Sequence, residues 1–255
     1  MASLTVGSLF SGAGLCDLGL EWAGFKHKWF CEIEEYPRKV LAASWPGKPI
    51  YKDVGKINAD TVERVDVLVG GFPCQDVSSS GRRKGISKGT RSGLWYEYHR
   101  LIRDLRPRYA IIENVKGLLS KGIDQVCAGL AEIGYDAEWE VLPAAVFGAP
   151  HLRERLFIVA YPHGNRSVRT PRVFVENPGD LGVHFQPDGP TLWNGLQIDR
   201  AGPVSDWLAL SGPRVHRVDD GSAEVLNRLK CLGNGIVPQQ SQYVGGLIKA
   251  AEARQ

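Results

Sequence analysis

Long hydrophobic runs are missing from this chain of 255 residues. No apolar stretch approaches the roughly 18 residues that a membrane-spanning helix needs. The first residues, Met1 to Val6, lack the basic and apolar regions of a secretory signal peptide. With 43% hydrophobic and 23% charged residues, the composition is that of an ordinary globular protein. These features predict an intracellular, cytoplasmic protein without a membrane partner.

Paired cysteines and a strong net charge are missing as well. The five cysteines are scattered, and no two have the CxxC spacing of zinc or redox sites. We therefore expect neither a disulfide framework nor a metal ion. A net charge of +3 does not by itself indicate nucleic acid binding. Local charge is more informative, because residues 76–93 carry five Lys or Arg against one acidic residue.

Alternating strand and helix patterns predict the fold. The apolar periodicity indicates strands at residues 4–10, 28–33, 65–70, 108–113, 137–142 and 156–160. Helices are expected at residues 17–23, 37–45, 94–106, 123–133 and 239–252. The opening order of strand, turn, helix and strand is typical of a doubly wound, mostly parallel sheet. The sequence therefore predicts an α/β, Rossmann-like fold.

A change in composition marks a second region between residues 162 and 217. Gly and Pro make up 14 of these 56 residues, and helical periodicity disappears. The large side chains of Phe185, Trp193 and Trp207 nevertheless favour some packing. We expect a small irregular module at 162–217, set into a main domain formed by residues 1–161 and 218–255. The alternative is an unstructured linker.

A glycine-rich turn follows the first predicted strand, where Gly12 and Gly14 come directly after Phe10. Such a turn before a helix lets the backbone approach a ligand, although a tight turn alone would need the same residues. The third glycine of a dinucleotide fingerprint is replaced by Asp17. A cofactor without a pyrophosphate is therefore favoured. Glu32, at the end of the second strand, could accept from the two hydroxyls of a ribose.

A single cysteine stands at a rigid corner, because Pro73-Cys74-Gln75 follows an apolar strand and Gly-Gly-Phe. This is a position for a nucleophilic thiol. An inert core cysteine would not explain the Pro and Gln beside it. Two further motifs lie at the ends of predicted strands. Glu113-Asn114-Val115 comes at the end of one strand, and Arg153-Glu154-Arg155 comes just before another.

These motifs together resemble the cytosine-5 DNA methyltransferase family. They are Phe-Ser-Gly-Ala-Gly, Gly-Gly-Phe-Pro-Cys-Gln, Glu-Asn-Val, Arg-Glu-Arg and Leu-Gly-Asn-Gly-Ile-Val-Pro, in this order. The resemblance covers about residues 4–161 and 214–250 and is strongest to small phage-type or orphan members. It implies a monomeric enzyme with an S-adenosylmethionine-dependent methyltransferase fold. Its reaction would methylate carbon 5 of cytosine in double-stranded DNA, as in restriction–modification systems.

The resemblance also implies the catalytic roles. Cys74 matches the nucleophile that adds to carbon 6 of the cytosine and makes carbon 5 reactive. Glu113 matches the carboxyl group that holds ring nitrogen 3, which requires a raised pKa. Arg155 and Arg153 match the arginines that support the base and the thiolate. Asn114 would brace the loop.

A pocket for S-adenosyl-L-methionine is implied in the same way. Glu32 would hold the ribose hydroxyls, and Asp53 would accept from the adenine amine. The expected cofactor-binding residues are Phe10, Gly12, Gly14, Glu32, Ile33, Asp53, Val54, Pro73, Leu94, Asn234 and Ile236.

The basic stretch corresponds to the mobile catalytic loop of the family, where cations suit phosphates. A cytosine inside duplex DNA must be flipped out for this chemistry. The expected substrate-binding residues are Gln75, Ser78, Ser80, Arg82, Arg83, Lys84 and Arg91. Base-edge readers are expected in the 162–217 region, with Arg166, Arg169, Arg172, Asn177, Gln186, Asn194 and Gln197 as candidates.

The sequence departs from the family at two places and leaves alternatives open. His151 stands where the family commonly has Gln, and segment 215–221 lacks the usual pattern. Three other functions fit parts of the sequence: cytosine-5 methylation of structured RNA such as tRNA, nucleic acid binding without catalysis, and a dinucleotide-dependent oxidoreductase. The oxidoreductase is disfavoured by Asp17.

Overall fold

The computed structural model describes residues 3–73, 92–149, 151–164 and 235–253. Within these residues the strands are β1 (Thr5–Leu9), β2 (Lys26–Cys31), β3 (Ile50–Tyr51), β4 (Val67–Gly70), β5 (Tyr109–Val115), β6 (Tyr135–Leu142) and β7 (Arg155–Pro162). The α-helices are α1 (Leu15–Trp22), α2 (Glu35–Ser44), α3 (Trp95–Leu105), α4 (Leu118–Lys121), α5 (Ile123–Glu132) and α8 (Pro238–Glu252). Short 3-10 turns lie at Val54–Lys56, Ser92–Leu94 and Ala144–Phe147.

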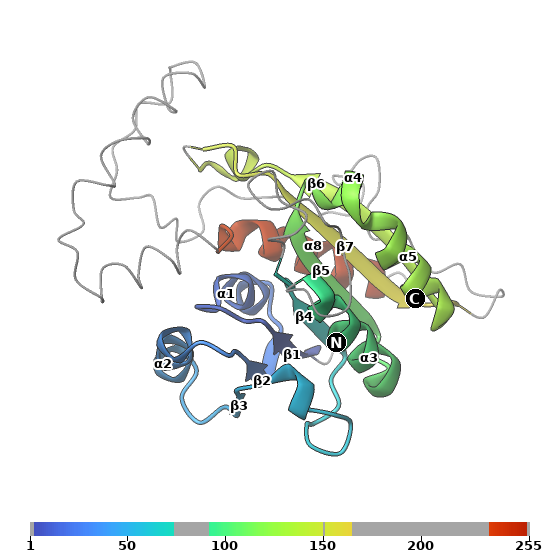
Figure 1. Cartoon of the computed structure of the whole chain (residues 1–255). Helices are drawn as coiled ribbons and strands as arrows, with labels where there is room; N and C mark the ends of the chain where they lie inside the picture. The colour runs from blue at the N-terminus through green and yellow to red at the C-terminus, as the bar shows by residue number, and fades with distance from the viewer. Residues whose placement is uncertain (1–2, 74–91, 150, 165–234, 254–255) are drawn as a thin grey trace.

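The strands form one sheet in the order β3-β2-β1-β4-β5-β7-β6 (Figure 1). Neighbours from β3 to β5 are parallel, whereas β7 is antiparallel to both β5 and β6. The chain order reverses beside β1, which is the switch point where doubly wound sheets bind ligands. The predicted α/β fold is therefore confirmed. Every predicted strand and helix is found, with ends displaced by at most two residues.

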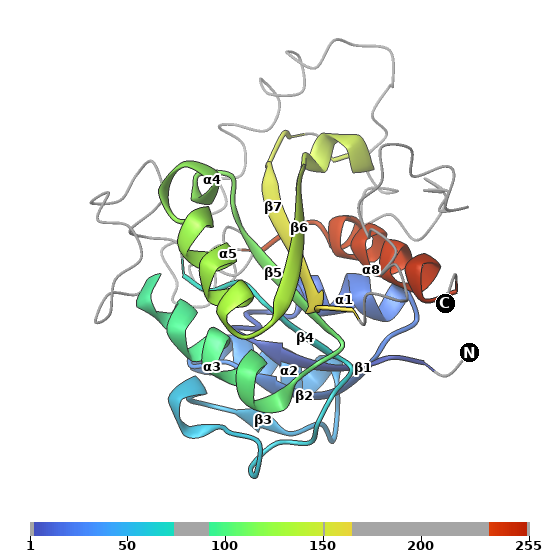
Figure 2. The same cartoon turned by 90° about the vertical axis from the view of Figure 1, so that its right-hand side faces the viewer.

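Helices cover both sides of the sheet (Figures 1 and 2). The central strands are therefore buried on both faces, which suits their apolar residues. Every residue of β4 and nearly every residue of β7 is buried. Helices α1 and α8 pack on the face that carries Val6, Val67 and Phe157. Helices α3 and α5 pack on the other face, over Leu68 and Ile112. Parallel strands buried in this way read as continuous hydrophobic runs.

Local signals set the ends of the helices. Helix α1 follows Gly14, whose φ of 79° is in the left-handed region. Helix α3 ends at Arg106, also left-handed, and Pro107 then prevents its continuation. Helix α8 starts with Pro238, where a missing N–H costs nothing. None of the helices in the described ranges is long and apolar enough to cross a membrane.

Helix α8 brings the end of the chain back to its beginning by packing against α1. The Ser241 hydroxyl donates to the carbonyl of Cys16 at 2.8 Å. The contact is close at Gly19, where an added Cβ would lie 1.9 Å from the Pro238 carbonyl oxygen. The irregular module at 162–217 and residues 218–234 lie outside the described residues, so the predicted domain boundaries stay a prediction.

We predict that Gly19→Ala destabilises the protein by about 2 kcal/mol, because the new methyl group overlaps the backbone of α8. Urea unfolding measures the change. Gly55→Ala is the matched control, since its Cβ would meet nothing closer than 3.4 Å. Equal unfolding free energies for the two variants would show that the α1–α8 contact can relax.

Candidate active site

The predicted site residues converge at one edge of the sheet, where the parallel strands end. Phe10 follows β1, Glu32 follows β2, and Gly71 follows β4. Glu113 lies near the end of β5. Because parallel strands end at the same edge, residues distant in the sequence become neighbours there.

Glu113 forms the centre of the described site through an ion pair with Arg155. The Arg155 Nε lies 3.0 Å from the Glu113 Oε1, and both side chains are about 15% exposed. The antiparallel pairing of β7 with β5 places Arg155 opposite Val115, two residues from Glu113. Burial raises the Glu113 pKa from its usual 4.5 to about 7, although Arg155 and Arg153 oppose the shift. The carboxyl group therefore exchanges a proton near neutral pH.

The chain leading to Cys74 is fixed against this carboxyl group. A Cβ at Gly71 would lie 2.4 Å from the Glu113 Oε2, so a side chain there would displace the carboxylate. The Asn114 amide donates to the Phe72 carbonyl at 3.1 Å, which agrees with the bracing role predicted for Asn114. Cys74 itself lies outside the described residues. Its distance to Glu113 stays a prediction.

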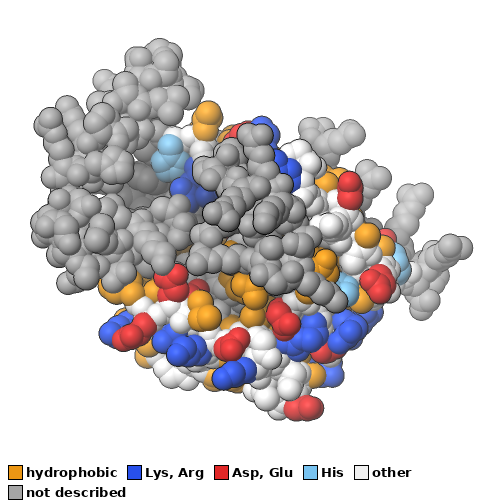
Figure 3. All heavy atoms as spheres, in the orientation of Figure 1, with side chains coloured by type: hydrophobic (Ala, Val, Ile, Leu, Met, Phe, Trp, Pro, Cys, Tyr) orange, Lys and Arg blue, Asp and Glu red, His pale blue; other side chains and the backbone are white. Residues whose placement is uncertain are grey.

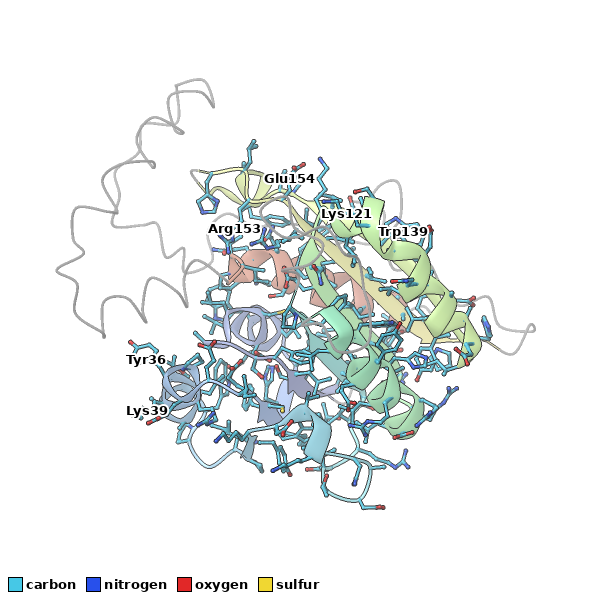
Figure 4. All side chains as sticks on the ribbon, viewed as in Figure 1. Tyr36, Lys39, Lys121, Trp139, Arg153 and Glu154 are labelled. Atoms are coloured by element: carbon cyan, nitrogen blue, oxygen red, sulfur yellow. The ribbon has the colours of Figure 1, made fainter. Side chains whose placement is uncertain are left out.

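Arg153 fastens the C-terminal segment to the site, and Figure 4 shows it beside the start of α8. Its Nε donates to the Gly235 carbonyl at 2.8 Å, and its backbone has a positive φ of 29°. In return, the buried Gln240 donates to the Leu142 carbonyl at 2.6 Å. Gln240 also accepts from the Val237 N–H at 3.3 Å. Sequence reasoning missed Gln240, because its partners are backbone atoms far away in the chain.

His151, which stands where the family commonly has Gln, lies next to these arginines. Burial and the charge of Arg153 lower the His151 pKa from its usual 6.5. The imidazole is therefore mostly neutral at pH 7. A neutral ring can offer both a donor and an acceptor, as a glutamine amide does.

Backbone N–H groups orient Glu32 beside the glycine-rich turn. Its Oε2 accepts from the Gly12 N–H and its Oε1 from the Glu34 N–H, each at 2.7 Å. Gly12 has a φ of 55°, which favours glycine. An added Cβ at Gly14 would lie 2.5 Å from the Trp45 ring. The turn and the carboxylate thus form one rigid unit, with Phe10 packed near Tyr98 on one side.

A hollow of about 420 Å³ lies next to this unit, lined by Ile33, Tyr51, Lys52, Asp53, Lys56, Ile57 and Thr61. Ile33 is 66% exposed, so its apolar surface is open to a ligand. The Asp53 carboxylate accepts from the Gly55 N–H at 3.0 Å. The structure therefore brings together Ile33 and Asp53, two of the predicted cofactor-binding residues. An apolar surface beside a carboxylate suits a flat ring with an amino group.

The other predicted residues occupy supporting positions or lie outside the described ranges. Val54 and Ile236 are buried in the core, and Leu94 and Pro73 are half-buried. The predicted residues outside the described ranges are Cys74, Gln75, Ser78, Ser80, Arg82, Arg83, Lys84, Arg91 and Asn234. The described part of the chain contains no group of three or more His, Cys, Asp or Glu arranged to hold a metal ion.

The strand order and the position of the site define the fold of S-adenosylmethionine-dependent methyltransferases. The family model of C-5 cytosine-specific DNA methylases matches residues 4–184. This chain belongs to the C-5 cytosine-specific DNA methylase family. The resemblance found in the sequence motifs is thereby confirmed.

Curated relatives include bacterial and phage proteins. Type II methyltransferase M.FnuDI of Fusobacterium nucleatum is 36% identical over 158 residues, which cover 60% of this chain and 46% of the relative. Orphan methyltransferase M.Rho11sI of Bacillus phage rho11s is 36% identical over 167 residues, covering 62% of this chain and 33% of the relative. The chain thus spans less than half the length of these relatives.

Solved structures agree on the fold. A protein described as a DNA modification methyltransferase encoded within an Escherichia coli prophage has 28% identity and a TM-score of 0.55, over 67% of this chain and 49% of that one. A variant of DNMT2 from Spodoptera frugiperda has a TM-score of 0.59 over 99% of this chain and 98% of its own. At 13% identity, DNMT2 shows a shared fold alone.

The raised pKa of Glu113 predicts a pH-dependent cost for folding. In the unfolded chain this carboxyl group ionises near pH 4.5, whereas in the folded protein it keeps its proton until about pH 7. The cost is therefore absent below pH 4.5 and fully present above pH 7. The unfolding free energy of Glu113→Gln minus that of the unsubstituted protein should therefore increase by about 2 kcal/mol when the pH is raised from 5 to 8.5.

Urea unfolding at both pH values measures this difference. Glu154→Gln is the matched control, because Glu154 is 39% exposed and pairs with Lys116 at the surface. The change measured for Glu154→Gln gives the effect of removing a surface carboxylate, and the change for Glu113→Gln is compared with it. A Glu113→Gln difference that is the same at pH 5 and pH 8.5 would contradict the raised pKa.

Proposed function

We propose that this protein transfers a methyl group from S-adenosylmethionine to carbon 5 of a flipped-out cytosine in duplex DNA. One observation carries the proposal: the mostly buried carboxyl group of Glu113 is paired with Arg155 and packed against the chain that leads to Cys74. Its burial raises the pKa to about 7. Family membership supplies the reaction class. The geometry at Glu113 supports the way the chain would perform it.

The proposed chemistry begins with the Cys74 thiolate, which adds to carbon 6 of the ring. The new sulfur–carbon bond breaks the aromaticity and leaves an enamine with electron density on carbon 5. Protonated Glu113 hydrogen-bonds to ring nitrogen 3 and stabilises the charge that develops there. Carbon 5 would take the methyl group as the bond between that group and the cofactor sulfur breaks, which would leave S-adenosylhomocysteine. A base would then take the proton from carbon 5, and departure of the Cys74 thiolate would restore the ring.

Arg155 makes the carboxyl group suitable for this task. Without a cation nearby, burial would raise the Glu113 pKa further and keep the group protonated throughout. The Arg155 guanidinium holds the pKa near 7, so the proton can be given and taken back within one cycle. Arg153, fastened to Gly235, contributes positive charge to the same site.

The rigid unit around Glu32 and the adjacent hollow would hold the cofactor. Ile33 would lie against the adenine, Asp53 would accept from its amino group, and Glu32 would hold the ribose. Bound S-adenosylmethionine supplies an electrophilic methyl group. The Gly12 N–H of the turn is already bonded to Glu32, so that group is not available to a phosphate.

The proposed contacts with DNA are inferred from the sequence. On the face drawn in Figure 3, charges of both signs are mixed around α2 and the segment after β3, so that surface does not offer a purely basic patch. The basic residues proposed to contact phosphates are in the 76–93 segment, and the proposed base readers are in the 162–217 region. Both lie largely outside the described residues.

We predict transfer of labelled methyl groups to duplex DNA, with Cys74→Ala inactive and Glu113→Gln slowed by about 100-fold or more. Scintillation counting with duplex DNA and tRNA as separate acceptors measures the activity. Glu154→Gln, on the surface beside the site, should retain full activity.

Bisulfite sequencing of plasmid from cells that express the protein then identifies the methylated cytosines. Labelling of tRNA without labelling of DNA would replace the proposal with RNA methylation. Retention of DNA without any labelling would indicate a binding protein that lacks catalysis.

A further inference from the structure

Most residues that line the cofactor pocket lie outside the strands and helices, because among them Tyr51 alone belongs to a strand and Lys56 to a 3-10 turn. Ile33 lies two residues after the end of β2, and the opposite wall runs through Asp53, Lys56 and Ile57. A loop that is free to move must be ordered when a ligand binds, and this ordering weakens binding. The pocket therefore needs contacts from behind that keep both walls in place.

Arg38 provides such contacts for the first wall. It lies in α2, and its Nη1 donates to the Glu32 carbonyl at 3.2 Å and also to the Ile33 carbonyl. These are the two residues whose side chains face the predicted ribose and adenine positions. Arg38 itself does not line the hollow. Its guanidinium acts on the backbone of the residues that do.

Arg100 provides the matching contacts for the second wall. It lies in α3, on the opposite side of the sheet from α2, and its Nη2 donates to the carbonyls of Val54 and Ile57 at 3.1 and 3.0 Å. Its Nε donates to the Glu97 carboxylate at 2.9 Å, which orients the guanidinium. Asp104 lies 3.7 Å from its Nη1. The side chain is 25% exposed and is absent from the lining of the hollow.

We propose that Arg38 and Arg100 are positioning residues that fix the two walls of the cofactor pocket from behind and so set the affinity for S-adenosylmethionine. This inference rests on the proposed function, which identifies the occupant of the pocket. Charge-assisted hydrogen bonds to backbone carbonyls are stronger than neutral ones and hold their acceptors in one geometry. Neither arginine reaches the catalytic centre at Glu113, so both act on binding and not on chemistry.

The test measures binding of S-adenosylhomocysteine to the full chain by isothermal titration calorimetry. We expect Arg38→Ala and Arg100→Ala each to weaken binding about tenfold. Lys39→Ala and Arg103→Ala are matched controls on the same two helices. Lys39 is exposed and pairs with the exposed Glu35, and Figure 4 shows it on the outer side of α2. Arg103 is exposed and pairs with Asp104, the more distant of the two carboxylates beside Arg100, so its substitution leaves the Arg100–Glu97 contact in place. The controls should bind within twofold of the unsubstituted protein.

Kinetics distinguish positioning from general destabilisation. The two alanine variants should raise the KM for S-adenosylmethionine about tenfold and leave kcat at saturating cofactor within twofold. Arg100→Lys keeps a charged donor and should recover most of the affinity. Should Arg100→Ala fail to fold, Glu97→Gln serves in its place, because it removes the carboxylate that orients Arg100 and should weaken binding about threefold.

The outcomes separate this inference from the proposed function. If the unsubstituted protein binds S-adenosylhomocysteine and the arginine variants bind it equally well, the positioning role is wrong and the proposed function stands. A fall in kcat that matches the loss of affinity would also overturn it. If the unsubstituted protein does not bind S-adenosylhomocysteine at all, the proposed function and this inference fail together.

Discussion

The site depends on the contact between Glu113 and Arg155, which the antiparallel strand β7 makes possible. If β7 were parallel to β5, both strands would end at the edge of the sheet where Glu113 lies. The first residue of β7, Arg155, would then lie at the opposite edge, far from Glu113. Because β7 runs the other way, its first residue reaches the end of β5. Burial alone would raise the Glu113 pKa beyond a useful range, and the arginine limits the shift.

The same edge of the sheet joins the proposed cofactor pocket to the proposed catalytic centre. Glu32 is held by the glycine-rich turn, and Gly71 carries the chain past Glu113 toward Cys74. The C-terminal segment closes the arrangement, because Arg153 holds Gly235 and Gln240 holds Leu142. Helix α8 is then anchored on α1 through Ser241. The proposed reaction needs such rigidity, since small displacements at a site are costly.

The sequence predicted those parts of the fold that follow from local patterns. Apolar runs gave the long strands, and the fold of β4 and β5 then brought Glu113 near the chain before Cys74. Strand β3 has two residues and α4 a single turn, which is too short for periodicity to indicate. Arg38, Arg100 and Gln240 could not be found, because they act on backbone carbonyls of distant segments. A hydrogen bond to a backbone carbonyl does not depend on the side chain of the accepting residue, so no sequence motif indicates it.

The central claim is that a cysteine and a carboxyl group from two neighbouring strand ends act on one cytosine. A duplex with 5-fluorocytosine at the target position tests it, because the fluorine cannot leave as a proton does and the adduct persists after methyl transfer. With S-adenosylmethionine present, the account predicts a covalent protein–DNA complex, located by mass spectrometry on Cys74 and formed much more slowly by Glu113→Gln. An adduct on any of the other four cysteines, Cys16, Cys31, Cys127 or Cys231, or methylation of ordinary DNA without any trapped complex, would contradict it.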